Sequence, residues 1–237
     1  MELKETFDYI FIWEKLPKLF SALPLTLLIT ALAIFFGWLL GLIVAIGKVG
    51  GPKWLRKFLF AVTDIIRGIP TVVLMYIVYF GLSVLLSKLF SITVTTTQKY
   101  IYIVSALMIE ISATGSELFR SAYSSIPRGQ LEAAQSLGYT GLQKFVHVIV
   151  PQGIRVILPN LGNTLLATIQ STALLYTLGI YDLLGRARQI DTNVTHMKTF
   201  ELYLAVAVIY WILGALTGWI FKRLEGSFAK GSREIAI

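Results

Sequence analysis

The stretch RGQLEAAQSLGYTGL, residues 128–142, lies between two apolar segments and is itself polar and rich in small residues. Gln130 to Leu137 contains good helix formers, namely leucine, glutamate, glutamine and two alanines. Gly138 fits the left-handed backbone position that ends many helices. The stretch therefore predicts a short polar helix that stops at a glycine turn.

A second helix is predicted directly after this turn. Thr140 can cap it, and we expect it to run over residues 141–149 and to be halted by Pro151. The first helix has so little apolar surface that it can bury little against its own chain. Two interpretations remain on these grounds: a helix that docks onto another protein, or an ordinary amphipathic helix on the membrane surface.

The composition of the chain indicates an integral membrane protein. Of its 237 residues, 56% are hydrophobic and only 14% are charged, whereas about a quarter are charged in soluble domains. The net charge of +8 is better explained by cations that anchor cytoplasmic loops than by nucleic-acid binding. The absence of cysteine excludes disulfides and thiolate metal sites.

We predict an all-α membrane protein with a single transmembrane domain, residues 1–237, and five membrane-spanning helices. The predicted spans are residues 25–46, 58–86, 100–123, 158–178 and 202–221, with an amphipathic interfacial segment at 1–20 and a polar connection at 124–156. The distribution of Lys and Arg favours an N-terminus outside and a cytoplasmic C-terminus.

Two features of the first two spans concern their packing. Gly37, Gly41 and Gly47 recur near one side of the first span, either to let another helix approach or because glycine is common in membrane helices. Residues 47–57 form a basic turn that we place in the cytoplasm. Pro70 should interrupt the second span, because proline lacks a backbone donor.

Polar residues inside the third and fourth spans indicate a pathway through the protein. Glu110 and Glu117 lie seven residues apart and so share one face of the third span. Glu110 lies deeper in the span, whereas Glu117, one turn from Arg120, is interpreted as structural or gating. The predicted substrate path comprises Glu110, Glu117, Asn163, Gln170, Ser171 and Thr172.

The spacing of the opening stretch adds a resemblance to a family. Glu132-Ala133-Ala134, three residues, Gly138, nine residues and then Val148 to Pro151 resembles the "EAA" loop of the membrane subunits of ATP-binding-cassette (ABC) importers. The RGIP sequence, residues 67–70, looks like the Arg-Gly-Thr-Pro of the polar amino acid permease branch. The Lys-Asp-Ser-Ser-Leu of that branch is replaced here by residues 170–174, QSTAL, so two charges are missing.

This resemblance implies a type I ABC importer permease fold in the bacterial inner membrane and a set of partners. Two such subunits, identical or related, would form the pathway. Two cytoplasmic ATPase subunits would bind ATP and Mg²⁺, and an extracytoplasmic amino-acid-binding protein would deliver the substrate. The helix at 130–138 would then be the coupling helix, with Gln130, Glu132, Ala133, Ala134 and Gly138 as the ATPase-coupling residues. The sequence TLGIYDLLGRA faintly resembles cystine-type permeases.

The chain is not expected to be an enzyme itself. It has no Gly-x-x-x-x-Gly-Lys-Ser/Thr sequence for binding phosphates, and His147 and His196 are isolated. A self-contained channel or secondary transporter is the alternative, which would predict inverted repeats or more charge near the midplane. A five-span scaffold or sensor is a third hypothesis, and it would not need so polar a fourth span.

Overall fold

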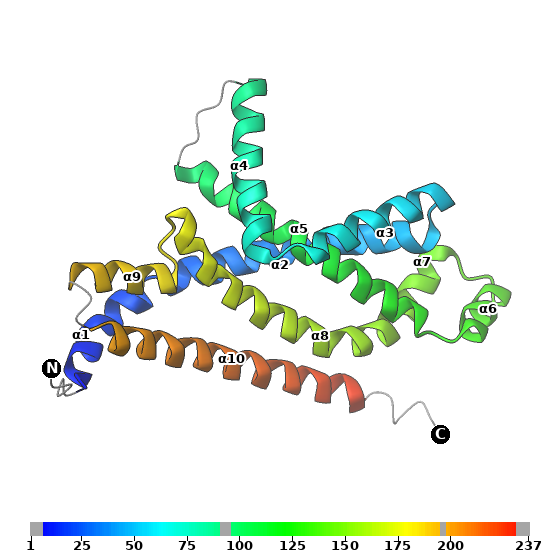
Figure 1. Cartoon of the computed structure of the whole chain (residues 1–237). Coiled ribbons are helices and arrows are strands. Elements are labelled where there is room, and N and C mark those ends of the chain that lie inside the picture. Colours follow the sequence, from blue (N-terminus) through cyan, green and yellow to red (C-terminus); the bar gives the residue numbers. More distant parts are fainter. Residues whose placement is uncertain (1–6, 91–95, 195–197, 231–237) are drawn as a thin grey trace. The chain divides into compact units, whose positions relative to one another are not determined.

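The structure, a computed structural model, describes residues 7–90, 96–194 and 198–230. His196 and the first six residues of the predicted segment 1–20 lie outside these ranges. Within them every regular element is helical (Figure 1). The elements are α1 Tyr9–Phe20, α2 Leu23–Gly50, α3 Lys53–Gly68, α4 Thr71–Phe90, α5 Thr96–Ser124, α6 Arg128–Ser136, α7 Gly141–Lys144, the π-helix η1 Phe145–Ile149, α8 Val150–Ser171, the 3-10 helix η2 Thr172–Leu178, α9 Leu183–Asn193 and α10 Thr199–Lys230.

Five helical stretches are long and apolar enough to cross a membrane, which confirms the predicted fold class. They are Leu23–Gly50, Thr71–Leu89, Gln98–Ser124, Gly141–Leu178 and Thr199–Phe228. The contacts of the chain form two compact units, and the single transmembrane domain stays a prediction. Unit 1 comprises Met1–Ala31 and Leu166–Thr217, and unit 2 comprises Leu32–Leu165 and Gly218–Ile237.

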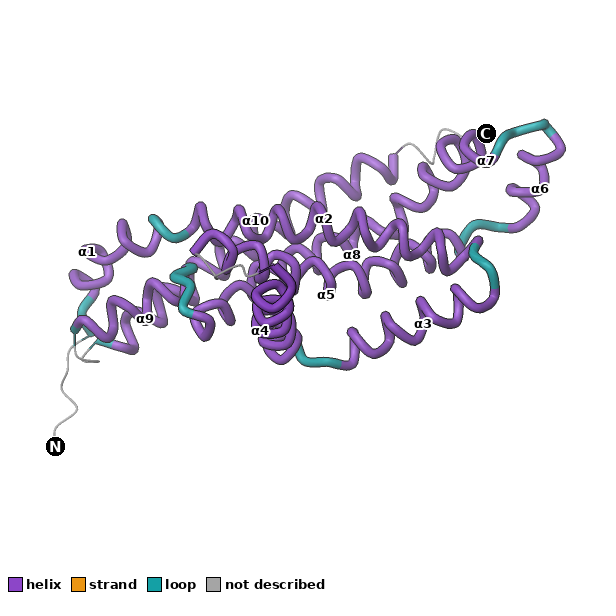
Figure 2. Tube along the Cα trace, turned by 90° about the horizontal axis from the view of Figure 1, so that it is seen from above, coloured by secondary structure: helices purple, strands orange, loops and turns teal. Residues whose placement is uncertain are grey.

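In unit 2, the predicted second span at 58–86 is two helices, α3 and α4. Ile69 between them is extended, with φ −90° and ψ 129°, as a residue before proline prefers. Figure 1 shows α4 leaving α3 at a steep angle, and Figure 2 shows α4 end-on while α3 lies lengthwise. Pro70 thus interrupts the helix as predicted, but α4 alone meets the requirements for a span. The charged, amphipathic α3 does not.

The glycines of α2 do permit a close helix crossing in unit 2. A Cβ atom added at Gly37 would lie 2.7 Å from the Cβ of Ile111, on α5. One added at Gly41 would lie 3.0 Å from the carbonyl oxygen of Ser112, also on α5. Of the two interpretations of this glycine pattern, close packing therefore holds for these two positions.

The polar connection at 124–156 ends differently from the prediction. Pro151 does not halt the second helix, because α7, η1 and α8 run on without a break. The backbone N–H of Val150 donates to the carbonyl of Phe145, five residues back, which is the pattern of a π turn. In a regular α-helix a proline ring clashes with the carbonyl four residues back. The wider turn directly before Pro151 changes the position of the backbone carbonyls in that turn.

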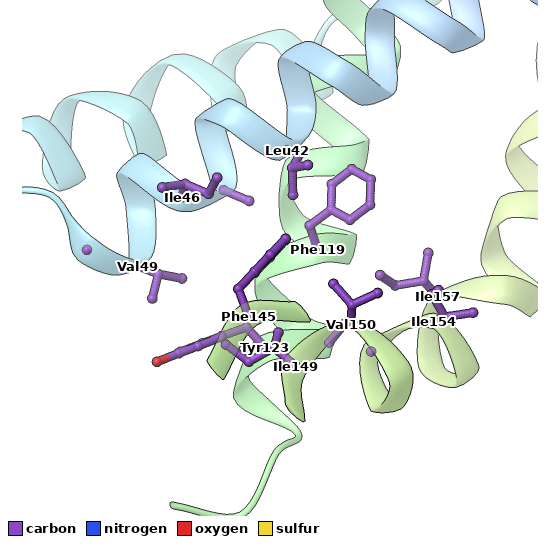
Figure 3. A pocket seen from close by; sticks show the side chains of 14 residues that line it. Leu42, Ile46, Val49, Phe119, Tyr123, Phe145, Ile149, Val150, Ile154 and Ile157 are labelled. Carbon is purple, nitrogen blue, oxygen red and sulfur yellow. The ribbon is translucent and has the colours of Figure 1, made fainter. Parts of the chain in front are cut away.

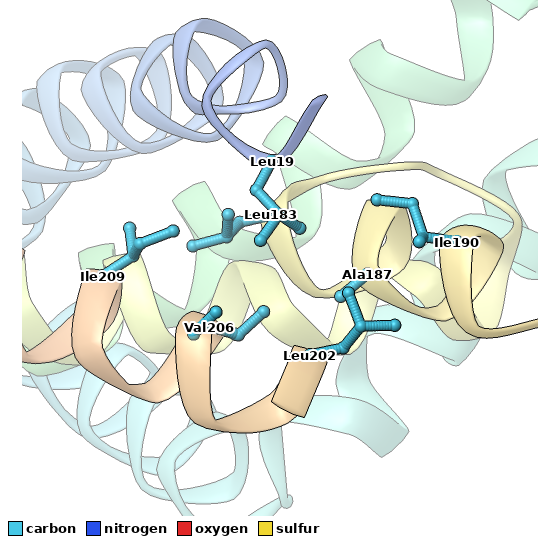
Figure 4. Packing of buried hydrophobic residues seen from close by; sticks show 8 residues of the cluster. Leu19, Leu183, Ala187, Ile190, Leu202, Val206 and Ile209 are labelled. Atoms are coloured by element: carbon cyan, nitrogen blue, oxygen red, sulfur yellow. The ribbon is translucent and has the colours of Figure 1, made fainter. Parts of the chain in front are cut away.

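Unit 1 has its own apolar core, which fastens the N-terminal helix α1. Leu19 of α1 is fully buried beside residues of α9 and of the first turns of α10 (Figure 4). The core consists of Leu19, Leu183, Ala187, Ile190, Leu202, Ala205, Val206 and Ile209. The opposite side of α1 is apolar but exposed, and the Trp13 side chain is 70% exposed. This arrangement suits the predicted interfacial position of the segment.

Candidate coupling and translocation site

The short polar helix predicted over Gln130 to Leu137 is present as α6, which starts two residues earlier and ends one residue earlier than predicted. It begins after Pro127 and ends at Ser136, and Leu137 forms its C-cap. Gly138 follows with φ +78°, the left-handed conformation. The backbone N–H of Tyr139 then donates to the carbonyl of Ala134 at 3.0 Å, so the turn satisfies a free carbonyl at the end of the helix.

Thr140 caps the following helix through a reciprocal capping box. The Thr140 hydroxyl accepts a hydrogen bond from the backbone N–H of Gln143 at 3.3 Å. The Gln143 side chain in turn accepts one from the backbone N–H of Thr140 at 2.8 Å. These two bonds rigidify the exit from the glycine turn, so α6 and α7 are presented as a defined pair.

One side of α6 is free and the other is held by its own chain. Glu132 and Ala133 are exposed, and the Glu132 carboxylate has no hydrogen bond or ion pair among the described residues. Ala134 is buried, and the Gln130 side chain accepts a hydrogen bond of 2.7 Å from Gln152 of α8. Gln130 therefore fastens α6 to α8, whereas Glu132 remains available to a partner.

A cleft that sequence reasoning missed lies behind α6. It has a volume of about 330 Å³ and is lined by Gln130, Ala133, Ala134, Leu137, Tyr139, His147, Val148 and Gln152. The Tyr139 and His147 rings meet edge to face, with centroids 6.1 Å apart. His147 thus contacts the turn after α6 through its ring, and its Nδ1 lies 3.0 Å from the Gln143 carbonyl oxygen.

Lys48 corrects another prediction. The sequence places it in a basic cytoplasmic turn, but α2 continues to Gly50 and the Lys48 side chain is only 1% exposed. Its Nζ donates to the hydroxyls of Thr63 at 2.7 Å and Ser116 at 3.0 Å and forms an ion pair with Glu117. A buried ammonium group is stable only when it is paired and hydrogen-bonded in this way.

Glu117 and Phe60 extend this cluster to a second cation. The Arg120 Nε donates to the Glu117 carboxylate at 2.8 Å, so one carboxylate is shared by two cations. The Phe60 ring of α3 lies 4.8 Å from the Lys48 Nζ and 5.8 Å from the Arg120 guanidinium carbon. The Lys48 cluster, which we define as Lys48, Phe60, Thr63, Ser116, Glu117 and Arg120, thereby joins α2, α3 and α5.

Glu110 has a different environment from Glu117. Its carboxylate accepts a hydrogen bond of 2.6 Å from the hydroxyl of Thr71, the first residue of α4. It is half-buried and has no cation partner among the described residues. The two acids that share a face of α5 therefore have different environments: Glu117 is paired with two cations, and Glu110 is hydrogen-bonded beside the α3–α4 break.

The predicted polar residues of the fourth span do not all point the same way. Asn163 and Gln170 are exposed and lie seven residues apart on α8, so they share one of its faces. Ser171 is half-exposed. Thr172, at the start of η2, is fully buried and donates to the carbonyl of Ile169 at 2.7 Å. In this chain Asn163 and Gln170 are thus accessible, whereas Thr172 is not.

The sequence of the chain identifies its family. Residues 33–230 match the sequence model of the binding-protein-dependent transport system inner membrane component. The chain belongs to this family of membrane transport subunits. This match confirms the resemblance drawn from the spacing of Glu132, Gly138 and Pro151.

Individual family members are similar over nearly the whole chain. The probable amino-acid permease protein YxeN of Bacillus subtilis is 32% identical over 96% of this chain and 99% of its own length. The L-cystine transport system permease protein TcyL of Bacillus subtilis is 28% identical over 98% of this chain and 96% of its own length. A crystal structure described as an amino acid ABC transporter with histidines matches with a TM-score of 0.80 and 31% identity, over 94% of this chain and 99% of the other.

Proposed function

We propose that this chain is the permease subunit of an ATP-driven importer for a polar amino acid. It forms part of the translocation path in the bacterial inner membrane and couples to a separate ATPase that binds ATP and Mg²⁺. A second permease subunit, two ATPase subunits and an extracytoplasmic amino-acid-binding protein complete the transporter. Similarity to several amino-acid permease proteins supports this class of cargo, and the similarity to TcyL favours cystine within it.

The observation that carries this proposal is the exposed surface of α6 and of the turn after it. It leaves the bundle as a helix with an exposed, unpaired Glu132 carboxylate and ends at a left-handed Gly138. Two large apolar side chains beside it, Leu137 and Leu142, are 76% and 72% exposed. A free carboxylate flanked by exposed leucines is a surface for a protein partner with a basic residue and an apolar groove.

Two connections lead from α6 into the spans, and each combines continuity of the backbone with side-chain contacts. On one side, α5 runs into α6 through Pro127, and the Lys48 cluster ties α5 to α2 and α3. On the other, α7, η1 and α8 are continuous, and the Gln130–Gln152 bond fastens α6 to α8. A partner whose ATP-bound and ATP-free states bind α6 differently would therefore shift the spans between inward-open and outward-open arrangements.

The substrate path is proposed along the exposed polar residues of the spans. Glu110 provides a carboxylate for the substrate ammonium group, and the side-chain amide of Asn163, in the same unit, suits the substrate carboxylate. Glu117 is neutralised by Lys48 and Arg120, so we assign it a structural or gating role.

Substitutions in α6 and its turn test the coupling. Glu132→Lys reverses the free charge, and Gly138→Ala strains the left-handed turn by roughly 1–2 kcal/mol. Both should reduce ATP-dependent uptake and the amount of ATPase that co-purifies, while membrane insertion stays normal. Gly129→Ala is the matched control, because a Cβ there meets nothing within 4 Å. Normal uptake in the Glu132 and Gly138 variants would contradict the coupling assignment.

The cargo is tested separately. Competition of neutral, basic and disulfide-linked amino acids for uptake identifies the substrate class. Glu110→Gln should raise the concentration of substrate needed for half-maximal uptake, because the ammonium group loses its carboxylate. Unchanged uptake and apparent affinity in this variant would show that Glu110 does not bind the substrate.

A further inference from the structure

A second cleft in unit 2 has no place in the path or in the coupling surface. It has a volume of about 330 Å³ and is half open, within the size range of sites for small organic ligands. Figure 3 shows side chains from the end of α2, the end of α5 and the start of α8 converging on it, among them Leu42, Phe119 and Ile157. Among its fourteen lining residues, Tyr123 alone has a polar side chain.

The lining determines what chemistry the cleft can accept. A stable water needs two to four polar partners, and aliphatic and aromatic walls do not supply them. The walls come from stretches that are apolar enough to span a membrane, Leu23–Gly50, Gln98–Ser124 and Gly141–Leu178. At such positions the surrounding solvent consists of lipid acyl chains. An acyl chain is therefore the occupant whose chemistry matches the walls.

Cations next to the lining residues indicate which lipid supplies this chain. Lys53 follows the lining residue Gly50 by three positions, Lys144 precedes Phe145, and Arg155 follows Ile154. Residues 42–57 and 141–157 contain no Asp or Glu. Lys48 in the first of these stretches is already paired inside the protein. The charge that flanks the lining residues along the sequence is thus positive, which favours a lipid with an anionic headgroup.

We propose that this cleft binds one acyl chain of an anionic phospholipid, whose phosphate is held by Lys53 and Lys144. The acyl chain packs against Phe145 and Ile149 of the π turn, which joins α7 to α8. A bound lipid therefore braces the segment through which α6 acts on the fourth span. This lipid site requires that the protein lies in a membrane, and it does not depend on which cargo the protein carries.

Fluorescence quenching by brominated lipid tests the site directly. Phe119→Trp places a reporter in the cleft of the full-length chain, purified in detergent, and its signal is the difference from the unmodified chain. We expect saturable quenching by phosphatidylglycerol with brominated acyl chains. Phosphatidylcholine with the same chains should require roughly tenfold more lipid, because each basic residue favours the anionic headgroup. Replacing Lys53 and Lys144 by Gln should remove this difference between the two lipids.

Two control variants make the outcome decisive. Gly153→Leu fills the cleft and should abolish quenching, since a Cβ at Gly153 lies 3.8 Å from the Cβ of Ala122 and has room to form. Phe36→Trp reports on a side chain that is 44% exposed on α2 and should show quenching without saturation or headgroup preference. A cleft reporter that behaves like Phe36→Trp, or one that stays unquenched because a second copy of the chain covers it, would overturn the proposal.

Native mass spectrometry of the unmodified chain provides a readout without a reporter. The chain should retain phosphatidylglycerol, and Gly153→Leu should retain less. Equal retention by the two chains would also overturn the proposal. If the proposed function is wrong, the uptake predictions fail while these lipid-binding results are unaffected.

Discussion

The Lys48 ammonium group is buried, and its partners come from distant parts of the chain. Thr63, Ser116 and Glu117 supply three oxygen atoms from α3 and α5. Removing the carboxylate alone would leave a buried cation with hydroxyl partners only. Loss of the Glu117 carboxylate should therefore destabilise unit 2 more than loss of the Lys48 ammonium group.

Glu117→Gln should lower the free energy of unfolding of the chain in detergent by about 3–5 kcal/mol, the usual cost of breaking a buried ion pair by removing one partner. Lys48→Met should cost less, because Glu117 keeps its bond to Arg120 at 2.8 Å. Thermal unfolding of both variants and of the double variant measures the difference. Asp64→Asn is the control, since its pair with Arg67 spans 3.8 Å between exposed side chains. Such pairs contribute at most about 1 kcal/mol. Equal losses for Glu117→Gln and Asp64→Asn would contradict the role of the cluster.

Asp182 in unit 1 makes stability depend on pH. Burial raises the pKa of this carboxyl from 3.8 to about 6, against the lowering effect of the backbone N–H groups of Gly185 and Leu184. The folded chain therefore holds this proton more tightly than the unfolded chain, so the stabilisation is complete below pH 4 and is lost as pH rises through 6. A difference of this size corresponds to about 3 kcal/mol.

Asp182→Asn should remove this pH dependence, because asparagine still caps α9 but does not titrate. The measurement is the difference in unfolding temperature between pH 4 and pH 8 for the two chains. The unfolding temperature of the parent should be lower at pH 8 than at pH 4. The same difference should be smaller in the variant. If the variant keeps the full difference, another group is responsible.

At the scale of elements, the crossing of α2 and α5 depends on a missing side chain. A Cβ at Gly41 would meet backbone atoms, the Ser112 oxygen at 3.0 Å and the Ser116 nitrogen at 3.2 Å, which cannot move aside as a flexible side chain can. Gly41→Ala should therefore separate the helices and lower the unfolding temperature. Gly81→Ala, in a helix position with nothing within 4 Å, should leave it unchanged or raise it slightly. A neutral Gly41→Ala would show that the crossing tolerates a larger separation.

The elements also show which local features were predictable. The stop at Gly138, the cap at Thr140 and the break at Pro70 depend on neighbouring residues, and all three were predicted from the sequence. The passage of a helix through Pro151 was not predicted. A π turn that no residue type signals directly precedes Pro151, and α8 also contains Pro159, so the rule for proline in an α-helix gave the wrong end.

At the scale of the whole molecule, the side of the membrane for each loop stays a prediction that labelling can test. The chain has no cysteine, so a single introduced one gives no background. In intact cells a membrane-impermeant maleimide should label Tyr181→Cys, and it should label Tyr139→Cys only after lysis. Both side chains are exposed, at 49% and 38%. The opposite pattern would reverse the orientation inferred from the Lys and Arg distribution.

The sequence by itself determined the all-α membrane class, the five spans and the short polar helix α6, because hydropathy, caps and glycine turns act over a few residues. It also indicated the family through the spacing of Glu132, Gly138 and Pro151. Only the tertiary structure decided that Lys48 is buried rather than part of a basic turn, and that an apolar cleft remains beside the π turn. The partners of Lys48 are 15 to 69 residues away, and packing between helices alone brings them together.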